Sequence, residues 1–432
     1  MDDLRNEDVY FETRAEQLLS ALEQTHGLSR RQLLKLGALA LPLLAGFARV
    51  ANPQTARAAA FVGSSPIVKL LPPEWFDVFS TNAEMRWDAV PGLGFTIPNE
   101  RFFVRDHTAT PMIDASTWQL KVFGTGLKGA PDIDHAIQFS YADLLRLPSR
   151  TTTCIVECAG NGRSYFTSQQ GTPAGGTQWH LGGIGVARWK GVPLSEILKR
   201  AHIQKTAVDV MPSGLDNTFL LNGVDAGHVR RPMPVSKALD DVLLAYEMND
   251  EPLPLDHGFP VRAIVPGWVG IAKIKWIGQI EVSATPLFSL WNTTQYRFIG
   301  PTYSPAAPPL TNQAVKSAFE LARGAQCPVG TPQLLTGRSW SGNAAISRVD
   351  VSVDDGATWT PAKLLGTHDE HGDHGSQAWT RWSFPWTPTA AGNVNLQARA
   401  TDKSGATQPD TVPFNTGGYL FWAVVTHPVV VA

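Results

Sequence analysis

The stretch TCIVECAGNGRS, from Thr153 to Ser164, joins a run of β-branched and apolar residues to a loop of very small ones. Residues 151–156 predict a buried strand, because β-branched side chains pack well on a pleated surface. Cys158 then lies at the end of that strand, where the glycines of the loop let a ligand approach the backbone closely. Arg163 adds a positive charge nearby, which favours a thiolate and attracts anions. The stretch therefore predicts a metal-binding or nucleophilic thiolate, with a pair of small buried cysteines as the alternative.

Cysteine usage favours a ligand or nucleophile over a disulfide framework. The chain has only three cysteines, Cys154, Cys158 and Cys327, and an odd count this small does not make a disulfide scaffold. The strand from Cys154 to Cys158 spans about 13 Å, whereas the Cα atoms of bridged cysteines lie within about 7 Å of each other. We therefore expect no disulfide between these two residues.

Composition excludes several classes of protein. The 432 residues carry 36 basic and 38 acidic side chains, and the formal charge of −2 argues against a protein that binds nucleic acid. Apolar residues make up 43% and charged residues 17%, which is typical of a packed globular chain, and the length allows two or three domains. The sequence has no G-x-S-x-G motif, no C-x-x-C-H motif, and only part of a dinucleotide fingerprint at Gly183–Gly185. Hydrolase and nucleotide-binding functions are therefore disfavoured.

Residues 1–58 are interpreted as a targeting segment. An acidic leader precedes Arg30 and Arg31, the apolar run 36–48 follows, and small residues at 56–60 offer a cleavage site. The apolar run is too short to cross a membrane, which needs about 20 residues. The pattern predicts a twin-arginine export signal and an extracytoplasmic mature chain, with an amphipathic N-terminal helix as the alternative.

Residues 61–300 mix short strands with short helices. Ser140 followed by Asp143 predicts a capped helix, and the apolar spacing of 193–202 predicts another. Alternation over 273–282 predicts a strand, which would carry Lys273 and Lys275 on one face. This mixture indicates an α+β domain.

Four prolines within 301–309 predict a stiff linker over 301–313. Beyond it, Val349, Val351 and Val353 alternate before a turn, and residues 382–386 and 394–400 alternate in the same way. Regular short strands with few helices predict an all-β sandwich of immunoglobulin type over 314–432.

Several charged segments are further candidates for a binding site. They are Arg105-Asp106-His107 after Phe102 and Phe103, then Asp256-His257 with Arg262, and then Lys273 with Lys275. Each is more often structural when it stands alone, but together their basic groups could gather around one anionic cofactor. A separate acidic loop carries three histidines, His368, His371 and His374, for which a solvated connection is favoured over a metal site.

These segments, taken in order, make the chain similar to the sulfite oxidase family of molybdenum-pterin enzymes. The matching blocks are FFVRDH (102–107), VECAGNGR (156–163), GVARW (185–189), LLAYEMNDEPLPLDHGFPVRAIV (243–265) and ISRVDVSVDDGATW (346–359). The resemblance implies an α+β molybdopterin domain followed by an immunoglobulin-like dimerisation domain. It also implies a molybdenum-molybdopterin cofactor and transfer of an oxygen atom to sulfur.

The resemblance also implies a role for individual residues. Cys158 matches the thiolate that ligates molybdenum, and a soft sulfur ligand suits such a metal. Arg105, Arg163 and Trp179 match the pocket that holds the substrate anion, where guanidinium groups would clamp a sulfur oxyanion. The positions that match the pterin-binding residues are Phe103, Arg105, Asp106, His107, Cys158, Asp216, His257, Arg262, Lys273 and Lys275.

Two departures from the animal and plant members point to one branch of the family. Residues 228–235 lack the tyrosine that those members place there, and residues 421–426 lack an N-A-W-H-R-like run. These differences and the export signal resemble the SoxC branch, the molybdenum subunit of sulfane dehydrogenase. The resemblance implies carrier-bound sulfane sulfur or sulfite as substrate, a c-type cytochrome as electron acceptor, and a homodimer or a heterotetramer. A free-standing sulfite dehydrogenase and a non-catalytic binding protein with a decayed metal site are the alternatives.

Overall fold

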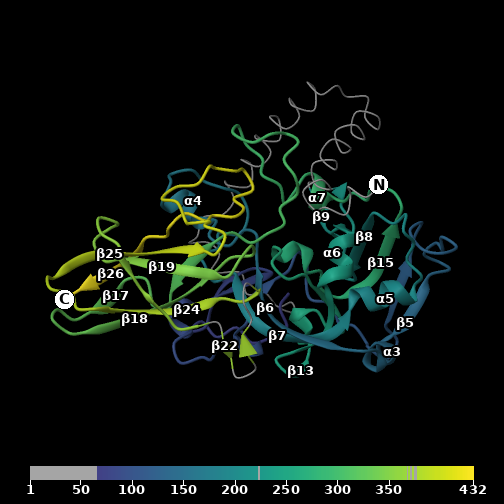
Figure 1. The fold of residues 1–432 in the computed structure, drawn as a ribbon, viewed down its shortest axis with the longest axis horizontal. Helices are drawn as coiled ribbons and strands as arrows, with labels where there is room; N and C mark the ends of the chain where they lie inside the picture. Colours follow the sequence, from purple (N-terminus) through teal and green to yellow (C-terminus); the bar gives the residue numbers. More distant parts are fainter. Residues whose placement is uncertain (1–65, 222–223, 367, 370–371, 374–376) are drawn as a thin grey trace, which may run out of the picture.

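The computed structural model describes residues 66–432, apart from 222–223, 367, 370–371 and 374–376, and forms two lobes that lie side by side (Figure 1). The predicted export signal lies outside the described residues, as do His371 and His374 of the histidine-rich loop. Within the described part of the chain, no helix is long and apolar enough to span a membrane.

The first lobe is built on two five-stranded assemblies and a small three-stranded sheet. The small sheet pairs β1 (Phe76–Phe79), β2 (Asn82–Met85) and β3 (Val104–Arg105). One large sheet has the order β11 (Met233–Pro234), β8 (Asp209–Gly214), β15 (Ile277–Ser283), β4 (Gln119–Phe123) and β5 (Ile137–Ser140). The other has the order β13 (Glu251–Pro252), β12 (Leu243–Met248), β7 (Ile184–Pro193) and β6 (Arg150–Glu157), with β14 (Arg262–Ile264) also paired to β12. The strand predicted over 151–156 is confirmed as the central part of β6.

Short helices connect these strands. They are α3 (Tyr141–Arg146), α4 (Ser164–Ser168), α5 (Leu194–Arg200), α6 (Val235–Asp240) and α7 (Leu290–Thr293), with 3-10 turns η3 (Trp87–Ala89), η4 (Asn99–Arg101), η5 (Leu255–His257) and η6 (Gly270–Ala272). The helix predicted after Ser140 is confirmed as α3, and both hydrogen bonds of the capping box between Ser140 and Asp143 are present. The helix predicted over 193–202 is confirmed as α5, which buries Leu194, Ile197 and Leu198.

The strand predicted over 273–282 is correct only in its second half. η6 ends at Ala272, and β15 begins at Ile277, after Trp276 has taken a left-handed backbone conformation with φ of 52°. Lys273 and Lys275 therefore lie in an irregular segment, where the Lys273 ammonium donates to the Trp268 carbonyl and the Lys275 ammonium pairs with a carboxylate. Lys273 is buried, with only 2% of its surface exposed.

The second lobe consists of two packed sheets in which most neighbouring strands are antiparallel. One has the order β16 (Lys316–Phe319), β18 (Gln333–Trp340), β24 (Thr380–Trp386) and β21 (Lys363–Leu364). The other has the order β17 (Ala325–Cys327), β26 (His427–Val431), β25 (Gly392–Asp402), β19 (Ile346–Ser352) and β20 (Thr360–Pro361). The alternating residues form a core between them, because Val349, Val351 and Leu396 pack in one cluster with Trp382 and Trp386. Two short hairpins complete the chain, β9 (Leu220–Leu221) with β10 (Val224–Asp225) and β22 (His368–Asp369) with β23 (Gly372–Asp373).

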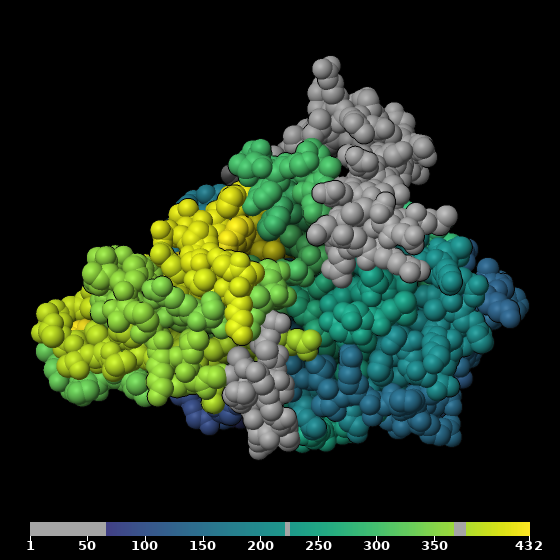
Figure 2. Space-filling model, viewed as in Figure 1, coloured from purple at the N-terminus to yellow at the C-terminus, as the bar shows by residue number. Residues whose placement is uncertain are grey.

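The segment between β25 and β26 leaves the second lobe and packs on the first. It lies against α4 (Figure 1), where Phe421 packs edge-on against Phe166 with ring centroids 5.0 Å apart. The side chains of Gln169 and Gln170 donate to carbonyl oxygens of this segment at 2.7 and 2.8 Å. In Figure 2 the yellow C-terminal residues lie against the green residues near 300, consistent with the 2.8 Å hydrogen bond from the Thr416 amide to the Ile299 carbonyl. The second lobe therefore contributes directly to the surroundings of the cysteine loop.

Candidate functional site

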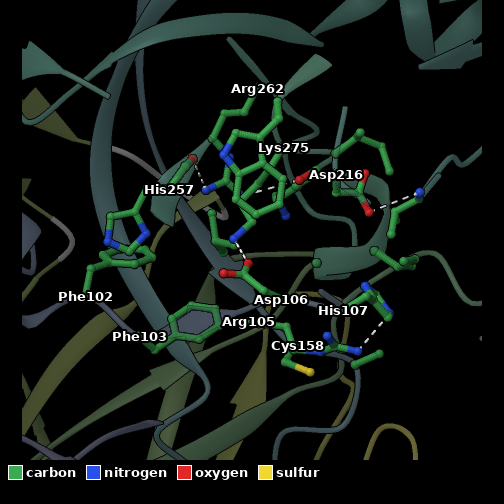
Figure 3. Close-up of a pocket in the computed structure, with 18 of the residues that line it drawn as sticks. Phe102, Phe103, Arg105, Asp106, His107, Cys158, Asp216, His257, Arg262 and Lys275 are labelled. Atoms are coloured by element: carbon green, nitrogen blue, oxygen red, sulfur yellow. Dashed lines mark hydrogen bonds and ion pairs between the residues drawn. The ribbon is translucent and has the colours of Figure 1, made fainter. Parts of the chain in front are cut away.

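A pocket lies where β3, the end of β6 and the turns η5 and η6 meet (Figure 3). Its walls combine aromatic rings, basic groups and a thiol. The lining residues are Phe102, Phe103, Arg105, Asp106, His107, Val156, Cys158, Ala159, Asp216, Val229, His257, Arg262, Gly270, Ile271, Lys273, Ile274, Lys275, Trp276 and Tyr296. The structure thus brings together segments that are far apart in the chain, such as Arg105 and Tyr296, which are separated by 191 positions and joined by a hydrogen bond. Of the predicted site residues, all except Arg163 and Trp179 line this pocket.

Cys158 stands at the first position after β6 and faces the pocket. Its backbone amide donates to the Gly183 carbonyl at 2.9 Å, and its sulfur accepts the Gly160 amide at 3.4 Å. All three cysteines are free, which confirms the prediction that Cys154 and Cys158 form no disulfide. A side chain at Gly270 would come within 2.8 Å of the Glu157 carbonyl, so glycine is needed for η6 to pack against the cysteine loop.

A buried polar network fixes the loop that carries Cys158. The Glu157 carboxylate accepts hydrogen bonds from the side-chain amide of Asn161 at 3.0 Å and from the Lys316 ammonium at 2.9 Å. Lys316 also donates to the Asn161 carbonyl at 2.8 Å, and the Asn161 side-chain oxygen accepts the Gly183 amide at 3.0 Å. Because Lys316 belongs to β16, the second lobe holds the cysteine loop of the first through a buried ion pair.

The pocket carries more positive than negative charge. Burial lowers the pKa of Lys273 to about 8 and that of Arg262 to about 9, and it lowers the pKa of Lys275 well below its ordinary value. Burial would lower the pKa of Arg105 too, but Tyr296 and Cys158 raise it above its usual range. The Asp106 carboxylate accepts a hydrogen bond from the Lys275 ammonium. Arg262 and Lys273 donate to backbone carbonyls, and Arg105 bonds to the ring of His107 and the hydroxyl of Tyr296. An anionic ligand would complete this arrangement, because buried charges are stable when they are paired.

Several polar atoms of the pocket are buried without a partner. They are His257 Nε2, Arg262 Nε and Asp216 Oδ1. Burial holds the pKa of His257 well below its ordinary value, and burial raises the pKa of Asp216 to about 6. Buried polar groups in proteins nearly always have hydrogen-bond partners, so these atoms indicate a polar ligand in the pocket.

Arg163 and Trp179 lie behind the pocket wall. The Arg163 guanidinium donates to the Gly417 carbonyl at 3.0 Å and to the Thr177 carbonyl at 2.8 Å, and it lies 5.5 Å from the ring of Tyr419. Trp179 is fully buried and packs edge-on against Phe103 at 6.3 Å. Their predicted roles in an anion pocket stay predictions.

Sequence reasoning missed two residues of the site. Tyr296 lies between α7 and the proline-rich stretch, and Lys316 lies at the start of the second lobe. Neither stands in a motif, and no local pattern marks them, because their importance comes from contacts across the fold.

Comparisons with known proteins show which proteins the chain resembles. Residues 107–291 match the oxidoreductase molybdopterin binding domain, and residues 322–428 match the Mo-co oxidoreductase dimerisation domain. Human mitochondrial sulfite oxidase is 36% identical over 332 residues, which cover 74% of this chain and 58% of that one. Chicken sulfite oxidase is 34% identical over 334 residues, which cover 74% of this chain and 69% of that one. The crystal structure of the sulfane dehydrogenase SoxCD from Paracoccus pantotrophus superposes with a TM-score of 0.67 and 25% identity, over 87% of this chain and 94% of that one.

The fold and the site therefore define a molybdopterin-binding oxidoreductase with a dimerisation domain. More particularly, the chain belongs to the sulfite oxidase family of molybdenum-pterin enzymes. The residues present fit that cofactor, because a thiol, a surplus of buried cations and unpartnered polar atoms surround one pocket. The chain spans 58% of the length of the human relative.

Proposed function

We propose that the protein is an exported molybdenum-pterin oxidoreductase that oxidises sulfur compounds, and that it is the molybdenum subunit of a SoxC-like sulfane dehydrogenase. The observation that carries the proposal is the pocket that Cys158 lines together with several basic side chains. The similarity to SoxCD over most of both chains supports this branch of the family.

In this proposal the residues of the pocket have separate roles. Cys158 would ligate the molybdenum, and a soft thiolate is a suitable ligand. Arg262, Lys273 and Lys275 would bind the phosphate of the pterin, while His257 and Asp216 would bond its polar edge with the atoms that have no partner in the protein. Arg105 would hold the oxyanion of the substrate, with Arg163 supplying positive potential from behind the wall.

When bound, the molybdenum-pterin group supplies two-electron oxygen-atom transfer to sulfur. For sulfite, the overall change is gain of one oxygen atom from water, with release of two protons and two electrons. A one-electron acceptor of the c-type cytochrome class would take the electrons in two steps. The guanidinium of Arg105 would orient the oxyanion and stabilise its charge in a buried site, where such interactions are stronger than in water.

A free-standing sulfite dehydrogenase is the second candidate function. The 34% to 36% identity with animal sulfite oxidases favours it. Purified protein, first checked for molybdenum and pterin, separates the two when it is given sulfite and cytochrome c. Fast turnover without any partner protein would favour the free-standing enzyme. Turnover only with carrier-bound sulfur and a co-purified cytochrome would favour the sulfane dehydrogenase, and absence of molybdenum would favour a non-catalytic binding protein.

Three further features belong to the same proposal. Residues 1–58 would direct folded, cofactor-loaded protein out of the cytoplasm by the twin-arginine route. The two-sheet second lobe would be an immunoglobulin-like dimerisation domain, as the similarity to the dimerisation family indicates. The assembly would be a homodimer, or a heterotetramer with a cytochrome subunit. Sedimentation of protein purified from the periplasm tests both the location and the assembly.

A further inference from the structure

A second pocket lies at the boundary between the two lobes and shares no lining residue with the pocket of Cys158. Its walls come from β1, β2 and the segment after Trp179 on one side, and from β16, β25 and β26 on the other. Three of its residues, Asp77, Glu84 and His180, are of types that bind metal ions. One oxygen or nitrogen atom from each lies within 4.8 Å of the corresponding atoms of the other two. One imidazole and two carboxylates are donors that Zn²⁺ and similar divalent ions accept.

Strand pairing places the two carboxylates side by side. Asp77 and Glu84 are direct partners in the antiparallel register of β1 and β2, so their side chains leave the sheet on the same face. Like charges at directly opposite positions destabilise a sheet. Arg86 lies 3.9 Å from Asp77, but its guanidinium donates two hydrogen bonds to Asp88, at 3.3 and 3.0 Å. A cation held between the two carboxylates would remove their repulsion.

Glu84 is already fixed in the orientation that a metal ligand needs. Its side chain is 2% exposed, and Oε2 accepts the backbone amides of His180 at 2.9 Å and of Gly182 at 3.3 Å. The other oxygen, Oε1, lies 2.7 Å from His180 Nδ1. The Met85 amide donates to the Gly182 carbonyl at 3.0 Å, and a side chain at Gly182 would overlap the Met85 carbonyl, so this segment packs closely on β2. Hydrogen bonds of this kind orient ligands in metal sites.

The other two side chains have room to close on an ion. The side chains of His180 and Asp77 are 49% and 51% exposed, and both line the second pocket. Ligand atoms bind Zn²⁺ at about 2.0–2.2 Å, so Asp77 has to turn toward the other two, which a half-exposed side chain can do. The ion would then replace the proton between His180 Nδ1 and Glu84 Oε1, and water from the pocket would complete its coordination.

We propose that Asp77, Glu84 and His180 form a binding site for a divalent ion of the Zn²⁺ class, separate from the molybdenum site. The imidazole favours such ions over Mg²⁺ and Ca²⁺, which prefer oxygen ligands. The ion ties the hairpin of β1 and β2 to the segment that follows Trp179, whose ring packs against Phe103 of the first pocket with centroids 6.3 Å apart. The inference does not depend on which sulfur compound the protein oxidises.

Titration calorimetry with Zn²⁺ alone tests this inference on full-length, molybdenum-loaded protein that has been dialysed against a chelator. We expect one Zn²⁺ to bind at this site in each chain. His180→Gln and Asp77→Asn should each weaken that binding at least tenfold, because even a group that only orients a ligand is worth about tenfold to a hundredfold in metal affinity. Both side chains are about half exposed, so neither substitution disturbs the core, and molybdenum content should stay at the wild-type level.

His135→Gln is the matched control. His135 Nδ1 lies 2.7 Å from an Asp132 oxygen, the same distance as in the pair of His180 and Glu84, but this pair is exposed and is not part of a three-ligand group among the described residues. The control should bind Zn²⁺ as the wild type does.

Four outcomes would overturn the inference. Wild-type protein that binds no Zn²⁺ would remove the site. Affinity of His180→Gln within twofold of the wild type would place the ion elsewhere, for example on the histidines of the acidic loop. An equal loss in His135→Gln would show unspecific binding to surface imidazoles. Ca²⁺ that binds as tightly as Zn²⁺ would show that the imidazole takes no part.

Discussion

Replacing Lys316 with methionine removes the ammonium group that is bonded to the buried carboxylate of Glu157. The side chains of this pair are 2% and 0% exposed, and Lys316 donates at 2.9 Å to Glu157 and at 2.8 Å to the Asn161 carbonyl. The other oxygen of Glu157 is buried without a hydrogen-bond partner. The substitution therefore leaves a charge in the core with the Asn161 amide as its remaining bonded neighbour.

The cost follows from this burial. Removing one partner of a buried ion pair destabilises a protein by about 3–5 kcal/mol. For a chain of this size, an average unfolding entropy of about 2.1 cal/mol/K per residue makes 1 kcal/mol worth roughly 1.1 °C, so we expect Lys316→Met to lower the Tm by about 3–6 °C. Scanning calorimetry at pH 7 measures this decrease in Tm.

Two further variants make the measurement specific. Lys190→Met breaks a salt bridge to Glu247 of the same 2.9 Å length, but its side chains are 39% and 25% exposed, so it should cost only about 0–1 kcal/mol. The double variant Lys316→Met with Glu157→Gln removes the uncompensated charge and should regain at least half of the lost Tm. If Lys316→Met lowered the Tm no more than Lys190→Met does, the buried pair would not be what holds the cysteine loop.

Three other changes test the site and its surroundings. Cys158→Ser should abolish turnover and deplete molybdenum while leaving the circular dichroism spectrum unchanged; near-normal activity would contradict the assignment of the ligand. Arg163→Met should raise the KM for the sulfur substrate by about tenfold or more, with molybdenum content nearly unchanged, and an equal loss of both would place Arg163 among the pterin contacts. Burial lowers the pKa of the His427 imidazole to about 4, so the folded state disfavours its protonation. The free energy of unfolding should therefore fall by at most about 3 kcal/mol as the pH drops from about 6.5 to 4. His427→Gln should lose less Tm over that range than the wild type, whereas the exposed control His135→Gln should behave as the wild type does.

Local pattern was enough to predict much of the fold. The capping box at Ser140, the β-branched run before Cys158 and the alternation from Val349 onward each describe interactions within a few residues, and the structure contains the expected elements. The strand predicted through Lys273 and Lys275 was wrong at its start. In that segment the Lys273 ammonium bonds to the Trp268 carbonyl of the preceding turn, and the Lys275 ammonium bonds to the carboxylate of Asp106, which is far away in the sequence. Alternation of apolar residues along the chain does not indicate such partners.

The candidate site divides in the same way. The chemistry predicted for Cys158 and for the basic segments follows from residue type and from family motifs, so the sequence alone was enough to name a candidate thiol ligand and candidate anion-binding groups. Tertiary structure decided which of them share a pocket, and it placed Arg163 behind the wall instead of on it. It also brought Tyr296 and Lys316 to the site from segments without a motif. The physical reason is that hydrogen bonds and ion pairs act over about 3 Å of space whatever the separation along the chain, so their partners are known only once the chain has folded.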